Sequence, residues 1–115
     1  MNDLTVKLFE EIRQDIAIHI CARISENSEL VVEGVDSGKL VEKLKGDWDY
    51  EYFLTVDISN KDLLIQKLKN DNVQIHDDRE LLEWIKANYS GNNAFSSFQS
   101  FLIFENIDFK TFTWT

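Results

Sequence analysis

The sequence predicts a single α+β domain over residues 1–115, in which a long N-terminal helix and two or three shorter helices pack on a mostly antiparallel sheet. The sheet is expected to end in a C-terminal strand. The length suits one domain, and 43% of the residues are hydrophobic, which is enough to form a core. Apolar side chains recur at helical spacing in some segments and alternate in others, and no proline or Gly/Ser-rich linker divides the chain.

The long helix is predicted over residues 3–25. Its apolar side chains recur every fourth residue and would form one stripe, made of Leu8, Ile12, Ile16, Ile20 and Ile24. Asn2 or Asp3 is positioned to cap this helix, and Asn27 follows its end. At about 1.5 Å per residue, such a helix would cross the whole domain.

The middle of the chain predicts short elements of both kinds. The β-branched run at 30–33 predicts a strand, and Asp36 is positioned to cap a brief helix that stops at Gly46. Alternating apolar residues over 50–58 predict the clearest strand, with both tyrosines of that segment on its inward face.

Two further helices are predicted from their start signals. Residues 59–62 have capping-box spacing, and a helix is expected from there to about residue 69. Asp77, followed three residues later by Glu80, is expected to cap a helix that ends near Tyr89.

The C-terminal segment is rich in aromatic residues. We expect it to form a hairpin of strands 98–105 and 108–114 that turns near Asn106, although Phe95, Phe98 and Phe101 also fit helical spacing. In the hairpin interpretation Trp114 is substantially buried.

The charge balance indicates the class of partner. The chain carries 21 acidic and 12 basic residues, for a net charge of −9. Such a field repels nucleic acid phosphates and anionic membrane surfaces, and it speeds association with a basic protein. We therefore expect a basic protein partner, no direct nucleic acid contact and no membrane contact. Solubility alone is the competing explanation of the charge.

Cysteine usage and the N-terminal residues predict a cytoplasmic protein. The single Cys21 excludes an intramolecular disulfide, and its apolar surroundings predict a buried, inert thiol. The first residues lack the basic and apolar regions of a signal peptide, and the longest apolar run is too short to span a membrane.

No residue pattern predicts catalysis. The two histidines, His19 and His76, lie far apart, and the motifs of hydrolases, zinc proteases and phosphate-binding loops do not occur. His76 precedes Asp77 and Asp78, but adjacent residues do not supply a closed set of metal ligands, and helix capping explains the carboxylates. We predict a protein that is not an enzyme and that uses no cofactor or metal.

Two acidic segments are candidate partner-binding sites. The first places carboxylates among aromatic residues and contributes Asp47, Trp48, Asp49 and Glu51. The second, beside Trp84, contributes Asp77, Asp78, Glu80 and Glu83. Aromatic side chains offer rigid contact area, and carboxylates attract Lys or Arg on a partner. The structural alternatives are a solvated loop entering a strand for the first segment and a capped helix start for the second.

The overall profile resembles that of small bacterial immunity proteins, such as those of contact-dependent growth inhibition. These are acidic, cysteine-poor α+β proteins without a catalytic motif, and the resemblance implies an inhibitor that neutralises a basic toxin, possibly a nuclease. Two alternatives remain open: an acidic regulatory or phage-encoded interaction module, including a nucleic acid mimic, and a small carboxylate- or metal-dependent hydrolase.

Overall fold

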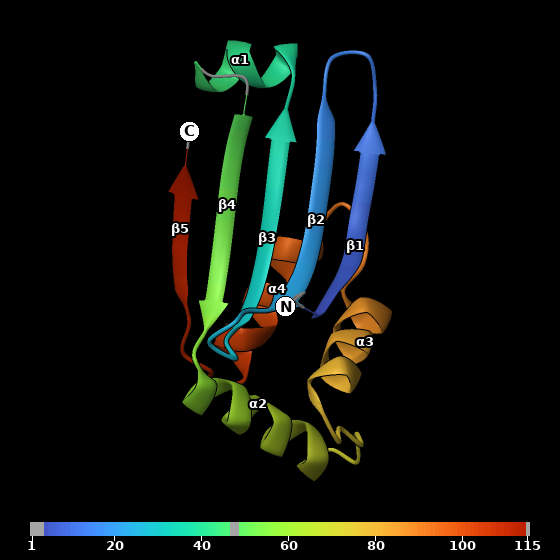
Figure 1. The fold of residues 1–115 in the computed structure, drawn as a ribbon, viewed down its shortest axis with the longest axis vertical. Coiled ribbons are helices and arrows are strands. Elements are labelled where there is room, and N and C mark those ends of the chain that lie inside the picture. Colours follow the sequence, from blue (N-terminus) through green and yellow to red (C-terminus); the bar gives the residue numbers. More distant parts are fainter. Residues whose placement is uncertain (1–3, 47–48, 115) are drawn as a thin grey trace.

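The computed structural model describes residues 4–46 and 49–114. Within them, five strands form one antiparallel sheet in the order of the chain, β1-β2-β3-β4-β5 (Figure 1). The strands are β1 (Leu4–Ile12), β2 (Ala17–Ile24), β3 (Leu30–Ser37), β4 (Asp49–Val56) and β5 (Lys110–Trp114). The helices are α1 (Lys39–Lys45), α2 (Ile58–Asn70), α3 (Asp78–Asn88) and α4 (Ala94–Phe104).

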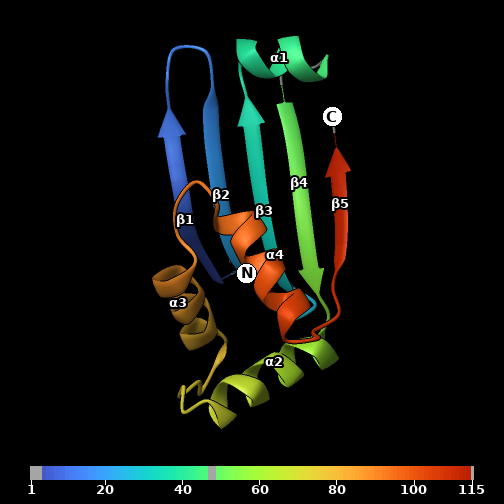
Figure 2. The same cartoon turned by 180° about the vertical axis from the view of Figure 1, so that it is seen from behind.

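The helices leave one face of the sheet uncovered. Seen from behind, α3 and α4 lie over the lower part of one face, α2 crosses the lower end, and α1 lies at the upper end (Figure 2). The core forms between the sheet and these helices, where Ile20, Leu54, Leu82 and Phe98 are almost completely buried. We call the opposite side of the sheet the open face.

The predicted long N-terminal helix is wrong, because residues 4–24 form the hairpin of β1 and β2. A period of four is also a multiple of two, so the same apolar residues fit one face of a strand. Ile16, Ile18 and Ile20 alternate as well, and β-branched side chains favour strands. The turn between the two strands contains no Gly or Pro, so the sequence carries no turn signal there. The turn is closed by the Arg13 N–H, which donates to the Ile16 carbonyl at 2.8 Å.

The predicted middle elements are largely present. β4 follows the alternating segment at 50–58, although Asp57 ends it by capping α2, with the Asn60 N–H donating to Asp57 Oδ1 at 2.9 Å. Asp77 caps α3 as predicted, accepting from the Glu80 N–H at 2.8 Å. The brief helix starts after Gly38 rather than at Asp36, because β3 continues to Ser37.

The C-terminal hairpin is half right. Residues 98–105 were predicted as a strand, but α4 occupies them up to Phe104, with Phe98 and Leu102 buried one helical turn apart. Asn106 turns the chain with a left-handed φ of 59°, and β5 then pairs with β4. The expected burial of Trp114 is wrong, since its exposed fraction is 61%.

None of the described helices is long and apolar enough to cross a membrane.

Candidate protein-binding surface

The open face of β4 and β5 combines carboxylates with aromatic rings. In the antiparallel register Glu51 lies opposite Trp114 and Phe53 opposite Phe112. Side chains two residues apart on a strand share a face, so Asp49 joins this group. We call these five residues the β4–β5 surface.

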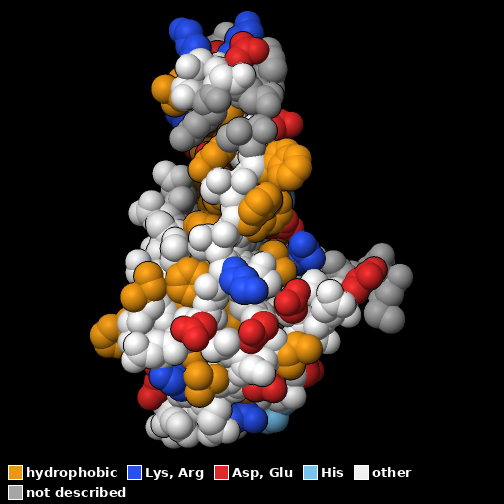
Figure 3. Space-filling model, turned by 90° about the vertical axis from the view of Figure 1, so that its left-hand side faces the viewer, with side chains coloured by type: hydrophobic (Ala, Val, Ile, Leu, Met, Phe, Trp, Pro, Cys, Tyr) orange, Lys and Arg blue, Asp and Glu red, His pale blue; other side chains and the backbone are white. Residues whose placement is uncertain are grey.

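The aromatic rings of this surface pack against one another and remain accessible. The ring centroids of Phe53 and Phe112 are 6.1 Å apart, and those of Phe112 and Trp114 are 5.9 Å apart. Phe112 is nevertheless 55% exposed. Figure 3, seen from the β5 edge, shows neighbouring hydrophobic side chains in the upper middle of the molecule and others lower down, where they alternate with charged side chains. Exposed aromatic groups of this kind are typical of protein interaction sites.

The first predicted acidic segment partly coincides with this surface. Asp49 is exposed and Glu51 is half-buried, on the side of the sheet that the helices leave uncovered. Tyr52 points to the helix side as predicted, where its hydroxyl donates to Asp36 Oδ1 at 3.1 Å and its ring meets Phe95 edge-on. The predicted site residues Asp47 and Trp48 lie outside the described residues.

The inward position of Tyr52 explains a glycine in the neighbouring strand. Gly34 lies opposite Tyr52 in the register, and a Cβ at Gly34 would come within 2.2 Å of the Tyr52 ring. The ring therefore lies directly over the glycine. Burial, together with the Asp36 carboxylate, raises the pKa of the Tyr52 hydroxyl.

The second predicted acidic segment is largely occupied by contacts within the protein. Asp77 caps α3, and Glu80 Oε1 accepts from the backbone N–H of His76 and contacts its Nδ1, both at 2.8 Å. These hydrogen bonds lower the pKa of Glu80. Asp78 forms an ion pair with Lys61, whose Nζ lies 3.0 Å from Asp78 Oδ1 and whose side chain is only 6% exposed. Glu83 is exposed.

The structure does not bring the two predicted acidic segments together. The helix α3 packs against β1 and β2, whereas Asp49 and Glu51 lie on β4, toward the other edge of the sheet (Figure 1). The hydrogen bonds of Asp77 and Glu80 match the helix-capping alternative considered from the sequence. The β4–β5 surface is therefore the better candidate.

At the centre of the open face, three neighbouring side chains contact one another. Glu33 Oε1 accepts from Arg23 Nε at 2.7 Å and lies 3.7 Å from Cys21 Sγ. Burial raises the pKa of the Cys21 thiol to about 11, and the Glu33 carboxylate adds to this shift. The thiol is buried as predicted, although on a strand instead of a helix.

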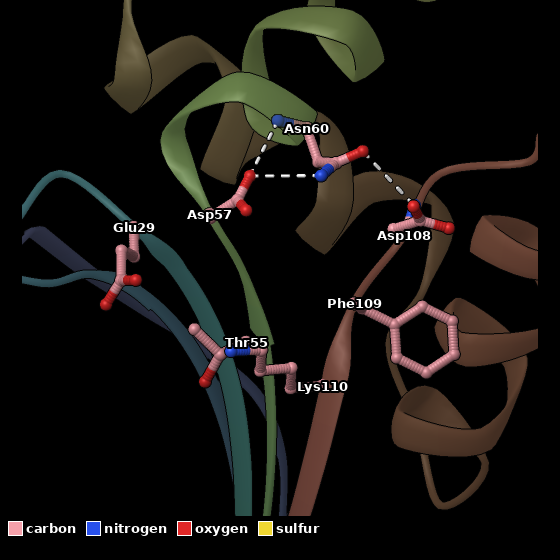
Figure 4. Close-up of a pocket in the computed structure, with 7 residues that line it drawn as sticks. All are labelled: Glu29, Thr55, Asp57, Asn60, Asp108, Phe109 and Lys110. Carbon is pink, nitrogen blue, oxygen red and sulfur yellow. Dashed lines mark hydrogen bonds between the residues drawn. The ribbon is translucent and has the colours of Figure 1, made fainter.

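A pocket of about 270 Å³ lies where β4, α2 and the start of β5 meet (Figure 4). Hydrogen bonds through the Asn60 side chain cross one side of this pocket. Asn60 donates its side-chain amide to Asp57 at 3.0 Å, and its carbonyl oxygen accepts from the backbone N–H of Asp108 at 3.3 Å. The first bond belongs to the capped start of α2, and the second holds Asp108, just before β5, to α2; both have a structural role.

Within residues 4–46 and 49–114, no group of three or more His, Cys, Asp or Glu side chains is placed to hold a metal ion. His19 and His76 each lie near a single glutamate, Glu10 at 3.4 Å and Glu80 at 2.8 Å. This geometry offers no ligand set around either histidine.

Phe112 was not among the predicted site residues, and Trp114 was predicted to lie in the core. The missed signal is the strict alternation of Lys110-Thr-Phe-Thr-Trp114, which places both aromatics on one side of a strand. Whether that side is covered depends on where the helices pack.

Comparison of the chain with protein-family models, curated proteins and solved structures finds no match.

Proposed function

We propose that this chain is a protein-binding inhibitor that engages a basic partner through the β4–β5 surface. In its most specific form it is an immunity protein that neutralises a basic cognate toxin, such as a nuclease. The observation that carries the proposal is the exposure of Phe112 and Trp114 on a sheet face that also holds Asp49 and Glu51.

The chemistry of this surface suits Lys or Arg side chains on a partner. A cation that stacks on the Trp114 ring gains a cation–π contact. Glu51 lies opposite Trp114 in the register, so its carboxylate can form an ion pair with the same cation. Phe112 adds apolar area beside them. Hot spots of protein interfaces combine such aromatic anchors with charge pairs that lose water on binding.

The net charge of −9 supports a basic partner through long-range attraction. The Debye length falls from about 30 Å at about 10 mM salt to about 8 Å at about 150 mM, so steering weakens over this range. We expect the association rate with the partner to fall about tenfold or more. An association rate that does not change with salt would rule out the electrostatic part of the proposal.

The inhibitor role is tested with the protein encoded directly upstream of this chain. We expect that protein to arrest growth when expressed alone, and co-expression of this chain to restore growth through a stable complex. If the upstream product forms no complex with this chain and its toxicity is unaffected, the immunity proposal is wrong.

The binding surface is tested by a pair of double variants with equal changes in charge. Asp49→Asn with Glu51→Gln should weaken partner affinity more than tenfold, because each lost carboxylate that pairs with a desolvated charge costs about 2–5 kcal/mol. The control, Asp62→Asn with Asp71→Asn, changes exposed carboxylates of α2 and its C-terminal cap. The partner affinity of this control variant should stay within threefold of that of the native chain.

Calorimetric titration separates the outcomes. Equal losses in the two double variants would mean that bulk charge, not this surface, controls affinity. If the variant Asp49→Asn with Glu51→Gln binds the partner within threefold of the native affinity, the β4–β5 surface is not the binding site. Glu83 on α3 then becomes the residue to test.

A further inference from the structure

The free edge of β5 is open to pairing with another strand. β5 is the last strand of the sheet, and all five of its residues, Lys110 to Trp114, are exposed. Among the described residues, no backbone hydrogen bond from a loop or turn reaches this strand. Alternate residues of an edge strand direct their N–H and C=O groups away from the sheet, where they can pair with a further strand.

The opposite edge of the sheet is protected. β1 contains a bulge between Lys7 and Phe9, and the Gly91 N–H donates to the Leu8 carbonyl at 2.9 Å. Charged Lys7, Glu10 and Glu11 also lie along this strand. Bulges, charges and a covering loop are the usual means of blocking edge pairing, and in the described part of the chain Lys110 alone serves this purpose at β5.

The sequence of β5 is complementary to itself in antiparallel pairing. If Phe112 faces Phe112 of a second copy, then Thr111 of each copy lies opposite Thr113 of the other. Lys110 of each copy then lies opposite Trp114 of the other. Pairs of Thr with Thr and of aromatic with aromatic stabilise neighbouring strands, and a lysine can stack on a tryptophan ring.

The charges near β5 favour this pairing, although the net negative charge of each copy opposes it. Lys110 is the one charged residue of β5, and Glu51 lies behind Trp114 on the same face. In the pairing described, Lys110 of the second copy would sit two strands from Glu51, about 10 Å between Cα atoms. Two extended side chains can span this distance, so each copy offers a cation to the acidic side of the other.

We propose that two copies of this chain associate through their β5 edges, with the two-fold axis at Phe112, to form a continuous ten-stranded sheet. Such a contact is isologous, the commonest symmetry of protein dimers. It joins the two open faces side by side, with Phe53 and Phe112 of both copies forming one central aromatic band. A five-residue edge makes a small interface, so the dimer is weak.

The proposal is tested by sedimentation of the full chain from about 10 µM to about 1 mM, a range that covers weak dimers. We expect the weight-average mass to rise from that of a monomer toward that of a dimer. A chain that stays monomeric up to about 1 mM overturns the proposal, whether or not it binds a toxin.

Three double variants at Thr111 and Thr113 test the register. Thr111→Lys with Thr113→Glu places opposite charges across the contact and should dimerise at least as tightly as the native chain. Two glutamates or two lysines at these positions place like charges there, and each should weaken dimerisation about tenfold or more. Circular dichroism confirms that each variant is folded.

The two-lysine variant separates register from bulk charge. It lowers the net negative charge of the chain, so general repulsion between copies falls while the repulsion across the β5 contact rises. If it dimerises as well as the variant with one lysine and one glutamate, the proposed pairing is wrong.

Discussion

The two faces of the sheet use the same strands but differ in what covers them. On the helix side, Leu54 and Val56 are fully buried beneath helices. On the open face, Phe53 alternates with them and rests against Phe112, which is more than half exposed. The covered face holds the fold together, whereas the open face carries aromatic residues that the fold does not need to bury. Substitutions of selected residues test this division.

Among the variants of the sheet, the largest loss of stability is expected on the covered face. Leu54→Ala should lower the free energy of unfolding by about 3–4 kcal/mol, because it leaves a cavity in a closed core. Phe53→Ala, one residue away on the open face, should cost about 1.5 kcal/mol although it removes a larger side chain. Urea unfolding of both variants checks the comparison; equal losses would mean that the open face contributes to stability as the core does.

The thiol of Cys21 tests how far the open face is accessible. With a pKa of about 11, very little thiolate forms at pH 8, so the native chain should react with a disulfide reagent about a hundredfold more slowly than the unfolded chain. The reaction should speed up as pH rises toward the raised pKa. Glu33→Gln removes a carboxylate that raises the pKa and should make the thiol react faster; a slower reaction would contradict the assigned cause.

The Lys61–Asp78 ion pair links α2 to α3 in the helix layer. Asp78→Ala should cost about 2 kcal/mol, because it leaves a buried ammonium group without its partner, and the partial exposure of Asp78 moderates the loss. Lys61→Met combined with Asp78→Leu removes both charges and should cost less than the single change. Thermal unfolding compares them. A larger loss in the double variant would mean that the pair itself is a net source of stability.

The smallest effect is expected at the C-terminal aromatic residues. Trp114→Ala should cost about 1 kcal/mol, since most of the ring is already in water. Phe98→Ala, also in the aromatic C-terminal segment but fully buried on α4, should cost about 4 kcal/mol. If Trp114→Ala destabilises the chain as much as Phe98→Ala, the indole is part of the core and is not available for binding.

The elements that depend on interactions between residues close in sequence were predicted. A side-chain cap such as Asp77 needs only a backbone N–H three residues ahead, and the sequence shows both. The alternation of β4 likewise requires only that one of its faces be buried. The left-handed residue at Gly46 ends α1 for the same kind of reason.

The acidic charge, the alternating pattern of β4 and the capped start of α3 could be predicted from the amino-acid sequence alone, whereas the cap of α2 is Asp57 and not the predicted capping box at 59–62. The pairing of residues 4–24 as two strands could not be predicted in this way, because their apolar period of four fits a strand as well as a helix. Pairing of β2 with β3 selects the strand. The exposure of Phe112 and Trp114 likewise could not be predicted from the alternation of β5. The alternation of Phe112 and Trp114 is the same for a strand in a core and for a strand at a surface. Their exposure depends on α4 packing against the other face of the sheet.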